Sequence, residues 1–130
     1  MDKIVVLNWY EVVIHLRNLF NNPIYIGLLV LIVLDIITGK SKAILCQEID
    51  SSVGTKGMIK HTTIIILNTV VGVVVGVFDL SGVGNIFGIF YAMEYITSIL
   101  ENLDVLGIPF PDNFKKNFIQ MRQNNDKKEL

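Results

Sequence analysis

Three long stretches of the chain are almost free of charged residues, and they limit the folds that the chain can adopt. They cover residues 23–38, 62–78 and 80–100. A helix needs about 20 apolar residues, at ~1.5 Å each, to cross roughly 30 Å of hydrocarbon, and each stretch comes close to that length. A buried strand usually has only about 4 to 8 residues, so a soluble sheet explains these stretches poorly. The sequence therefore predicts an all-α integral membrane protein with transmembrane helices at 23–40, 62–78 and 80–102.

The composition excludes several classes of protein. Hydrophobic residues make up 52% of the chain and charged residues 18%, whereas a soluble domain has about 25% charged residues. A formal net charge of −1 excludes a nucleic-acid-binding protein held by bulk electrostatics. The single cysteine, Cys46, and two distant histidines form neither a disulfide framework nor a local metal motif. No catalytic constellation is found, so we expect no enzyme, no cofactor and no bound metal.

Each predicted transmembrane helix carries polar side chains at helical spacing. Asp35 and Glu94 lie inside predicted spans, where a charge costs roughly 2.5 kcal/mol or more, so both must face protein or water. The polar residues either form hydrogen bonds within a helical bundle or line an aqueous path between assembled subunits. These residues are Asp35, Thr38, Asn68, Tyr91, Glu94, Ser98 and Glu101.

Two pairs of glycines have the GxxxG spacing that lets helix backbones approach closely. Gly72 and Gly76 lie in the second predicted span, and Gly84 and Gly88 lie in the third. We expect these faces to form contacts in a homo-oligomer. The same spacing could also serve packing within one subunit.

The distribution of basic residues predicts the orientation in the membrane. The turn around Asp79 contains no basic residue, whereas the loop before the second span and the segment after the third span are rich in lysine. By the positive-inside rule, that loop and the C-terminus are cytoplasmic and the Asp79 turn is external. The cytoplasmic lysines are Lys40, Lys42, Lys56, Lys60, Lys115 and Lys116.

Both ends of the chain are predicted to form amphipathic helices in what is otherwise a single domain. Residues 3–20 place Trp9 and Phe20 on one face and His15 on the other. This helix either lies on the membrane surface or crosses it as a further span, which would make four. Residues 111–122 predict a short cytoplasmic amphipathic helix, and residues 123–130 a flexible tail.

Five short motifs, in this order and spacing, carry a family resemblance that covers about residues 28–120. They are Asp35-Ile-Ile-Thr38-Gly39, Ser51-Ser52-Val-Gly54-Thr-Lys-Gly57-Met, Phe90-Tyr91-Ala-Met-Glu94, Ser98-Ile-Leu-Glu101-Asn102 and Gly107-Ile-Pro109-Phe-Pro111. With these motifs the chain resembles the toxin-secretion and phage-lysis holins, which are found in phages of Gram-positive bacteria and in clostridial toxin loci.

The resemblance implies a multi-pass protein of the bacterial cytoplasmic membrane whose partners are the lipid bilayer and other copies of itself. Such a protein oligomerises into lesions that dissipate the proton-motive force. An endolysin or a large toxin then passes the membrane without binding the holin directly, and no nucleic acid is involved. Two alternatives stay open: a small ion or proton channel, and a non-lytic membrane anchor for a phage or toxin component.

Overall fold

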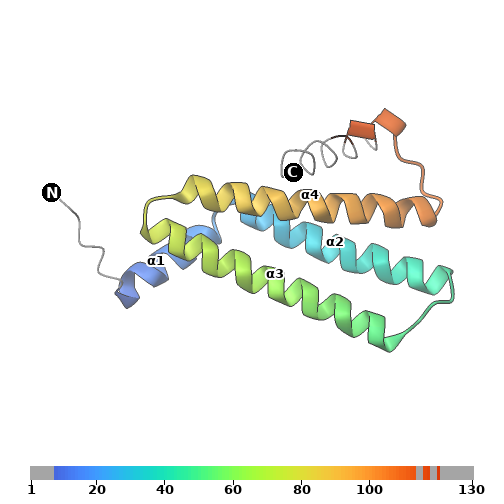
Figure 1. The fold of residues 1–130 in the computed structure, drawn as a ribbon, viewed down its shortest axis with the longest axis horizontal. Coiled ribbons are helices and arrows are strands. Elements are labelled where there is room, and N and C mark those ends of the chain that lie inside the picture. Colours follow the sequence, from blue (N-terminus) through green and yellow to red (C-terminus); the bar gives the residue numbers. More distant parts are fainter. Residues whose placement is uncertain (1–7, 114–115, 118–119, 121–130) are drawn as a thin grey trace, which may run out of the picture. The chain divides into compact units, whose positions relative to one another are not determined.

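The computed structural model describes residues 8–113, 116, 117 and 120. Its elements are α1 (Trp9–Leu19), α2 (Pro23–Leu45), α3 (Ser51–Val77) and α4 (Ser81–Val105), shown in Figure 1. The described residues contain no strand, which confirms the all-α fold class. Of these helices, α2, α3 and α4 are long and apolar enough to cross a membrane. The protein is therefore an all-α membrane protein with three candidate spans.

Helices α2 and α3 extend beyond the uncharged stretches that predicted them. Helix α2 continues to Leu45, and the chain then turns through Gln47, whose φ is 56°. Helix α3 begins at Ser51 because the Asp50 carboxylate caps it, accepting a hydrogen bond from the Ser52 N–H at 2.7 Å. A helix continues past the hydrocarbon until its end is capped or the chain turns. Hydropathy gives the length of a span, and capping gives the length of the helix.

Helix α1 begins at Trp9, because the side chain of Asn8 caps it. The Asn8 carboxamide oxygen accepts hydrogen bonds from Tyr10 N at 2.7 Å and Glu11 N at 3.1 Å. The backbone of Asn8 itself is extended. Residues 1–7 lie outside the described part of the chain, as do most of the predicted C-terminal helix at 111–122 and the whole of 123–130.

The chain divides into two compact units. The first unit comprises residues 1–30 and 50–92, and the second comprises residues 31–49 and 93–130. All of α1 and α3 belong to the first unit, whereas α2 and α4 each contribute residues to both. Each unit has its own buried residues.

In the first unit, α1 and the start of α2 run along α3 in the opposite direction. His15 contacts Gly76 and Leu19 contacts Gly72, while further along the chain the Tyr25 hydroxyl hydrogen-bonds to Thr69 Oγ1 at 2.6 Å. The break between α1 and α2 therefore lies beside α3 rather than beyond its end. Buried residues of this unit include Tyr25, Leu28 and Ile64.

Helix α1 packs both His15 and Leu19 on α3 and leaves aromatic residues exposed. Trp9 is 81% exposed, whereas His15 packs on Gly76. An exposed aromatic side chain of this kind suits the headgroup level of a membrane.

Candidate functional site

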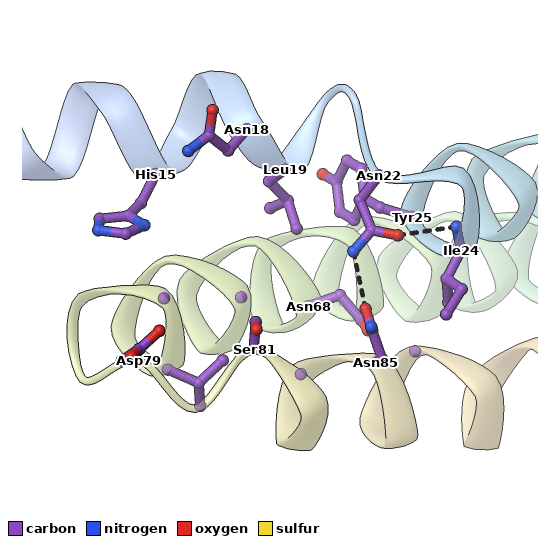
Figure 2. Close-up of a pocket in the computed structure, with 15 residues that line it drawn as sticks. His15, Asn18, Leu19, Asn22, Ile24, Tyr25, Asn68, Asp79, Ser81 and Asn85 are labelled. Atoms are coloured by element: carbon purple, nitrogen blue, oxygen red, sulfur yellow. Dashed lines mark hydrogen bonds between the residues drawn. The ribbon is translucent and has the colours of Figure 1, made fainter.

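A cavity of about 240 Å³ lies in the first unit, lined by residues of α1, α3, α4, the start of α2 and the turn after α3. Figure 2 shows the side chains around it. Much of its lining can form hydrogen bonds, which is unusual inside helices of such high hydropathy. Its polar lining residues are His15, Asn18, Asn22, Tyr25, Asn68, Asp79, Ser81 and Asn85.

The break between α1 and α2 borders this cavity and is fixed by Asn22. The Asn22 side chain accepts from Ile24 N at 2.9 Å, which caps α2, and Pro23 occupies the first helical position. Its Nδ2 donates to Asn85 Oδ1 of α4 at 2.7 Å (Figure 2). A single amide therefore starts one helix and ties it to another.

Asn68, like Tyr25, is almost fully buried at the cavity, at 5% exposure. Its Nδ2 donates to the carbonyl oxygen of Ile64 at 3.1 Å, one turn earlier in α3. Its Oδ1 has no hydrogen-bond donor among the described residues, yet no buried side-chain oxygen or nitrogen in that part of the chain lacks a partner. The Oδ1 atom is therefore accessible, and the cavity is the space that it borders.

The four glycines of the two GxxxG motifs make room for this arrangement. A Cβ atom at Gly72 would lie 2.7 Å from Leu19 Cδ1, and one at Gly76 would lie 2.7 Å from His15 Nδ1. At Gly84 a Cβ would lie 2.9 Å from Val75 Cγ2, and at Gly88 it would lie 3.1 Å from Ile24 Cγ2. These glycines make close contacts within one subunit. Their role between subunits stays a prediction.

Charged groups lie on the α1 and Asp79 sides of the cavity. His15 Nε2 lies 3.6 Å from Glu11 Oε2, one turn earlier in α1. Asp79 is an exposed lining residue in the turn between α3 and α4, where its φ is 59° and its N–H donates to the Gly76 carbonyl oxygen at 3.0 Å.

The second unit holds a different polar cluster, formed by Asp35, Thr38 and Asn102. Asn102 Nδ2 lies 3.5 Å from Asp35 Oδ1 and 3.3 Å from Thr38 Oγ1. Asp35 and Asn102 are each only 8% exposed. Gly39 lies beside the cluster, where a Cβ would make an ordinary van der Waals contact with Asn102 Nδ2 at 3.7 Å. The structure thus brings two predicted residues of α2 to an amide of α4.

Asn102 is a residue of this cluster that the sequence analysis missed. The motif at 98–102 contains both Glu101 and Asn102, and the predicted residue, Glu101, is exposed in the structure. Asn102 follows the buried residues Tyr95 and Leu100 on α4, and it lies seven positions after Tyr95. The i, i+7 spacing places Asn102 on the same helix face as Tyr95, but the sequence does not show that this face is the covered one.

The other predicted polar residues of α4 are half-buried and are not gathered at one point. Tyr91 makes edge contacts with Phe87 and Phe90, at centroid distances of 5.1 and 5.3 Å. Glu94 and Ser98 are half-buried. Of the predicted cytoplasmic lysines, Lys40, Lys56, Lys60 and Lys116 are exposed, Lys42 is half-buried, and Lys115 lies outside the described residues.

The described residues bring no metal-binding group together. Among residues 8–113, 116, 117 and 120, no three His, Cys, Asp or Glu side chains are placed to hold an ion. Cys46 is exposed. The side chains described at the two polar sites form hydrogen bonds and, at His15 and Glu11, a charged contact.

Comparison with known proteins supplies the family. Residues 13–123 match the bacteriophage holin family. An "uncharacterized 14.9 kDa protein in nagH 3'region" of Clostridium perfringens is 34% identical over 106 residues, which are 79% of this chain and 77% of that protein. A second uncharacterized protein, from C. perfringens strain 13, is 30% identical over 103 residues, which are 78% of this chain and 76% of that protein. No solved structure matches the chain significantly.

Proposed function

This chain belongs to the bacteriophage holin family, and on that basis we propose that it forms lesions in the bacterial cytoplasmic membrane. Copies accumulate in the bilayer, assemble into homo-oligomers and then open. The lesions dissipate the proton-motive force and release an endolysin, or export a large toxin, without binding that cargo. The family match over residues 13–123 is the observation that carries this proposal.

The distribution of polar groups supports it. Association of helices in lipid depends on close packing and hydrogen bonds, because lipid tails are as apolar as the helices. The chain buries polar side chains in candidate spans, including Asp35, Asn68 and Asn102. Each of these groups is stable in lipid only while it faces protein or water. When an opening forms, such groups exchange their protein partners for water. Assembly and opening therefore use the same residues.

The proposed topology follows the lysines. The loop between α2 and α3 and the segment after α4 are cytoplasmic, and the Asp79 turn is external. The N-terminus is then external, because three spans place the two ends on opposite sides. Helix α1 is not an independent fourth span in this topology; it precedes α2 along the same side of α3.

The test is lysis in a reconstructed system. The gene is induced in a bacterium that also produces an endolysin without a secretion signal. We expect a period of normal growth followed by abrupt lysis. An inactive endolysin with its catalytic residue replaced serves as the matched control, and with it the membrane should depolarise while the cells keep their shape. Continued growth with the active endolysin, at confirmed levels of membrane-inserted protein, would overturn the proposal.

A small ion channel is the second candidate, and the polar cavity of the first unit favours it. Permeant size separates the two. Vesicles containing the purified protein are loaded with a small fluorescent dye and with a folded fluorescent protein. Release of the dye and the folded protein indicates a holin lesion. Dissipation of an ion gradient with retention of the dye and the protein indicates a channel. Retention of the dye, the protein and the ion gradient indicates an anchor.

A further inference from the structure

The cavity of the first unit borders backbone that is not helical, and this is the observation from which the inference starts. Between Leu19 and Pro23 the chain leaves the helix, and Asn22 joins the cavity lining. Inside a bilayer, irregular backbone is tolerated only where protein covers it or where it lines a water-filled space. If this break lies beside the apolar part of α3, it must therefore be covered by protein or must border water.

The contacts of α1 and α2 place the break within the length of the apolar segment of α3. Leu19 lies at Gly72 and Tyr25 at Thr69, so the residues between them lie beside the span 62–78. Asn68 is 11 positions before Asp79, which is about 17 Å of helix at ~1.5 Å per residue. Measured from the Asp79 turn, this is about half of a hydrocarbon layer of roughly 30 Å.

The lining of the cavity suits water. Its volume of about 240 Å³ is far above the ~10–15 Å³ that one water molecule needs. Asn68 is 95% buried, since its exposure is 5%, and its Oδ1 has no donor among the described residues. A bare carboxamide oxygen in a dry apolar space costs on the order of 1–3 kcal/mol, and a water molecule removes that cost.

Charge near the cavity selects the solutes that can follow the water. Asp79 lines it, and Glu11 is paired with His15 on the α1 side. Arg17 is the basic residue of α1, and it is exposed and not part of the lining. A carboxylate among amides and hydroxyls attracts small cations and repels anions.

We propose that this cavity is a water-filled vestibule, open on the side of the Asp79 turn, which carries water and small cations to Asn68 in the resting subunit. The amide side chains of Asn22, at the break between α1 and α2, and of Asn85 form part of its wall. The vestibule rests on the proposed topology and is independent of the lesion, because it exists before any oligomer opens.

The chain is well suited to a labelling test, because Cys46 is its single cysteine and can be replaced by serine. New cysteines are then placed in matched neighbours. Asn85→Cys lies in the vestibule and Ile86→Cys, at a residue that is 70% exposed, outside it. Asn68→Cys and Leu67→Cys form the deeper pair. Ser81→Cys marks the mouth.

Membrane-impermeant thiol reagents are applied to intact protoplasts before lysis begins. Because the reactive species is the thiolate, which forms in water, we expect Asn85→Cys to react about tenfold or more faster than Ile86→Cys. Asn68→Cys should likewise react faster than Leu67→Cys. A cationic reagent should react faster than an anionic one at Asn85→Cys, and Asp79→Asn should remove that preference. Equal rates within both pairs, or labelling only in inverted vesicles, would overturn the vestibule.

A second measurement leaves the lining residues unchanged. In lipid nanodiscs, magnetisation transfer from water to the Asn68 side-chain amide should be seen in the unmodified protein. A dry cavity would give no such transfer. Absence of transfer to Asn68, with transfer seen at Ser81, would overturn the vestibule even if a cysteine variant misfolds. Failure of lysis in the endolysin test would instead remove the proposed lesion, since labelling is recorded before lysis.

Discussion

The two units of the chain bury amide side chains in different ways. In the first unit, Asn68 and Asn85 border a cavity, and glycines stand at the points where helices approach one another. In the second unit, Asn102 is 8% exposed and donates to Asp35 and Thr38, and the buried residues there include the large side chains of Tyr95 and Leu100. The amides of the first unit therefore border open space, whereas the amide of the second unit is enclosed by protein partners.

This difference has a functional meaning under the proposed lesion. A group that already meets water loses little when an aqueous opening forms beside it. A group whose partner is another side chain must exchange that partner for water. We therefore expect the first unit to control the access of water and the second unit to resist opening.

The largest effect should come from removing the glycine contacts that shape the first unit. Gly76→Leu places a large side chain where a Cβ alone would lie 2.7 Å from His15 Nδ1. Overpacking costs about 1–3 kcal/mol, and α1 has no buried residue to oppose its release from α3. We expect tryptic cleavage after Arg17 to accelerate by about tenfold, the equivalent of ~1.4 kcal/mol, and lysis onset to shift.

Gly82→Leu is the matched control, because a Cβ at Gly82 would meet nothing within 4 Å. It should keep the cleavage rate and the lysis time of the natural sequence. If Gly76→Leu behaves like Gly82→Leu, then the packing of α1 on α3 does not depend on the glycines, and these glycines do not shape the first unit.

The next effect concerns charge in the second unit. Asp35 and Glu94 lie inside candidate spans, where moving one charge through 100 mV changes the free energy by roughly 2.3 kcal/mol. If collapse of the membrane potential favours opening through these carboxylates, Asp35→Asn and Glu94→Gln should alter how strongly an uncoupler advances lysis. The measurement is lysis time against uncoupler dose.

Asp79→Asn provides the contrast from the first unit, since Asp79 lies in an exposed turn between spans. Its uncoupler response should match that of the natural sequence. A wild-type lysis time that does not respond to uncoupler, or an equal advance in every variant, would reduce Asp35 and Glu94 to packing residues.

A smaller effect compares one amide from each unit. Asn102→Ala removes the donor to Asp35 and Thr38, and Asn85→Ala removes the acceptor for Asn22. Interhelical hydrogen bonds in membrane proteins contribute about 0.6 kcal/mol on average and up to about 1.7. We expect Asn102→Ala to approach the upper value and Asn85→Ala the lower, because water in the vestibule replaces the lost partner of Asn22. Unfolding titrations in mixed micelles measure both, and a reversed order would contradict the assignment of wet and dry units.

Sequence reasoning was effective where the signal was local. The apolar stretches predicted α2, α3 and α4, because hydrocarbon thickness sets the length of such a stretch. The starts of α1 and α3 also carry local signals, since Asn8 and Asp50 are capping residues just before each helix. These signals are present in the sequence and mark the residues at which α1 and α3 begin.

The candidate sites depend on pairings that no local pattern contains. Asn22 and Asn85 are 63 positions apart, and Asp35 and Asn102 are 67. Adjacent residues of a helix point about 100° apart, so the choice between Glu101 and Asn102 depends on which side α2 covers. The sequence places polar residues at both positions, and only tertiary packing selects one.

The smallest expected effect is at Asp50, a solvent-exposed carboxylate that serves as a reference for the buried Asp35. Hydrogen bonds from the side chain and the backbone N–H of Ser52 lower the pKa of Asp50 from its ordinary value. A lowered pKa in the folded state means that the cap stabilises α3 at all pH values above the unfolded pKa, and that this contribution is lost as the pH falls through the folded pKa. We therefore expect hydrogen exchange of the Ser52 amide to show an acid-dependent loss of protection in the natural sequence. Asp50→Asn keeps a capping oxygen without a titrating group, so its protection should not change over the same pH range, once the intrinsic pH dependence of exchange is subtracted. An identical acid response in both proteins would show that Asp50 does not govern the start of α3, and that its titration cannot serve as the solvated reference against which Asp35 is compared.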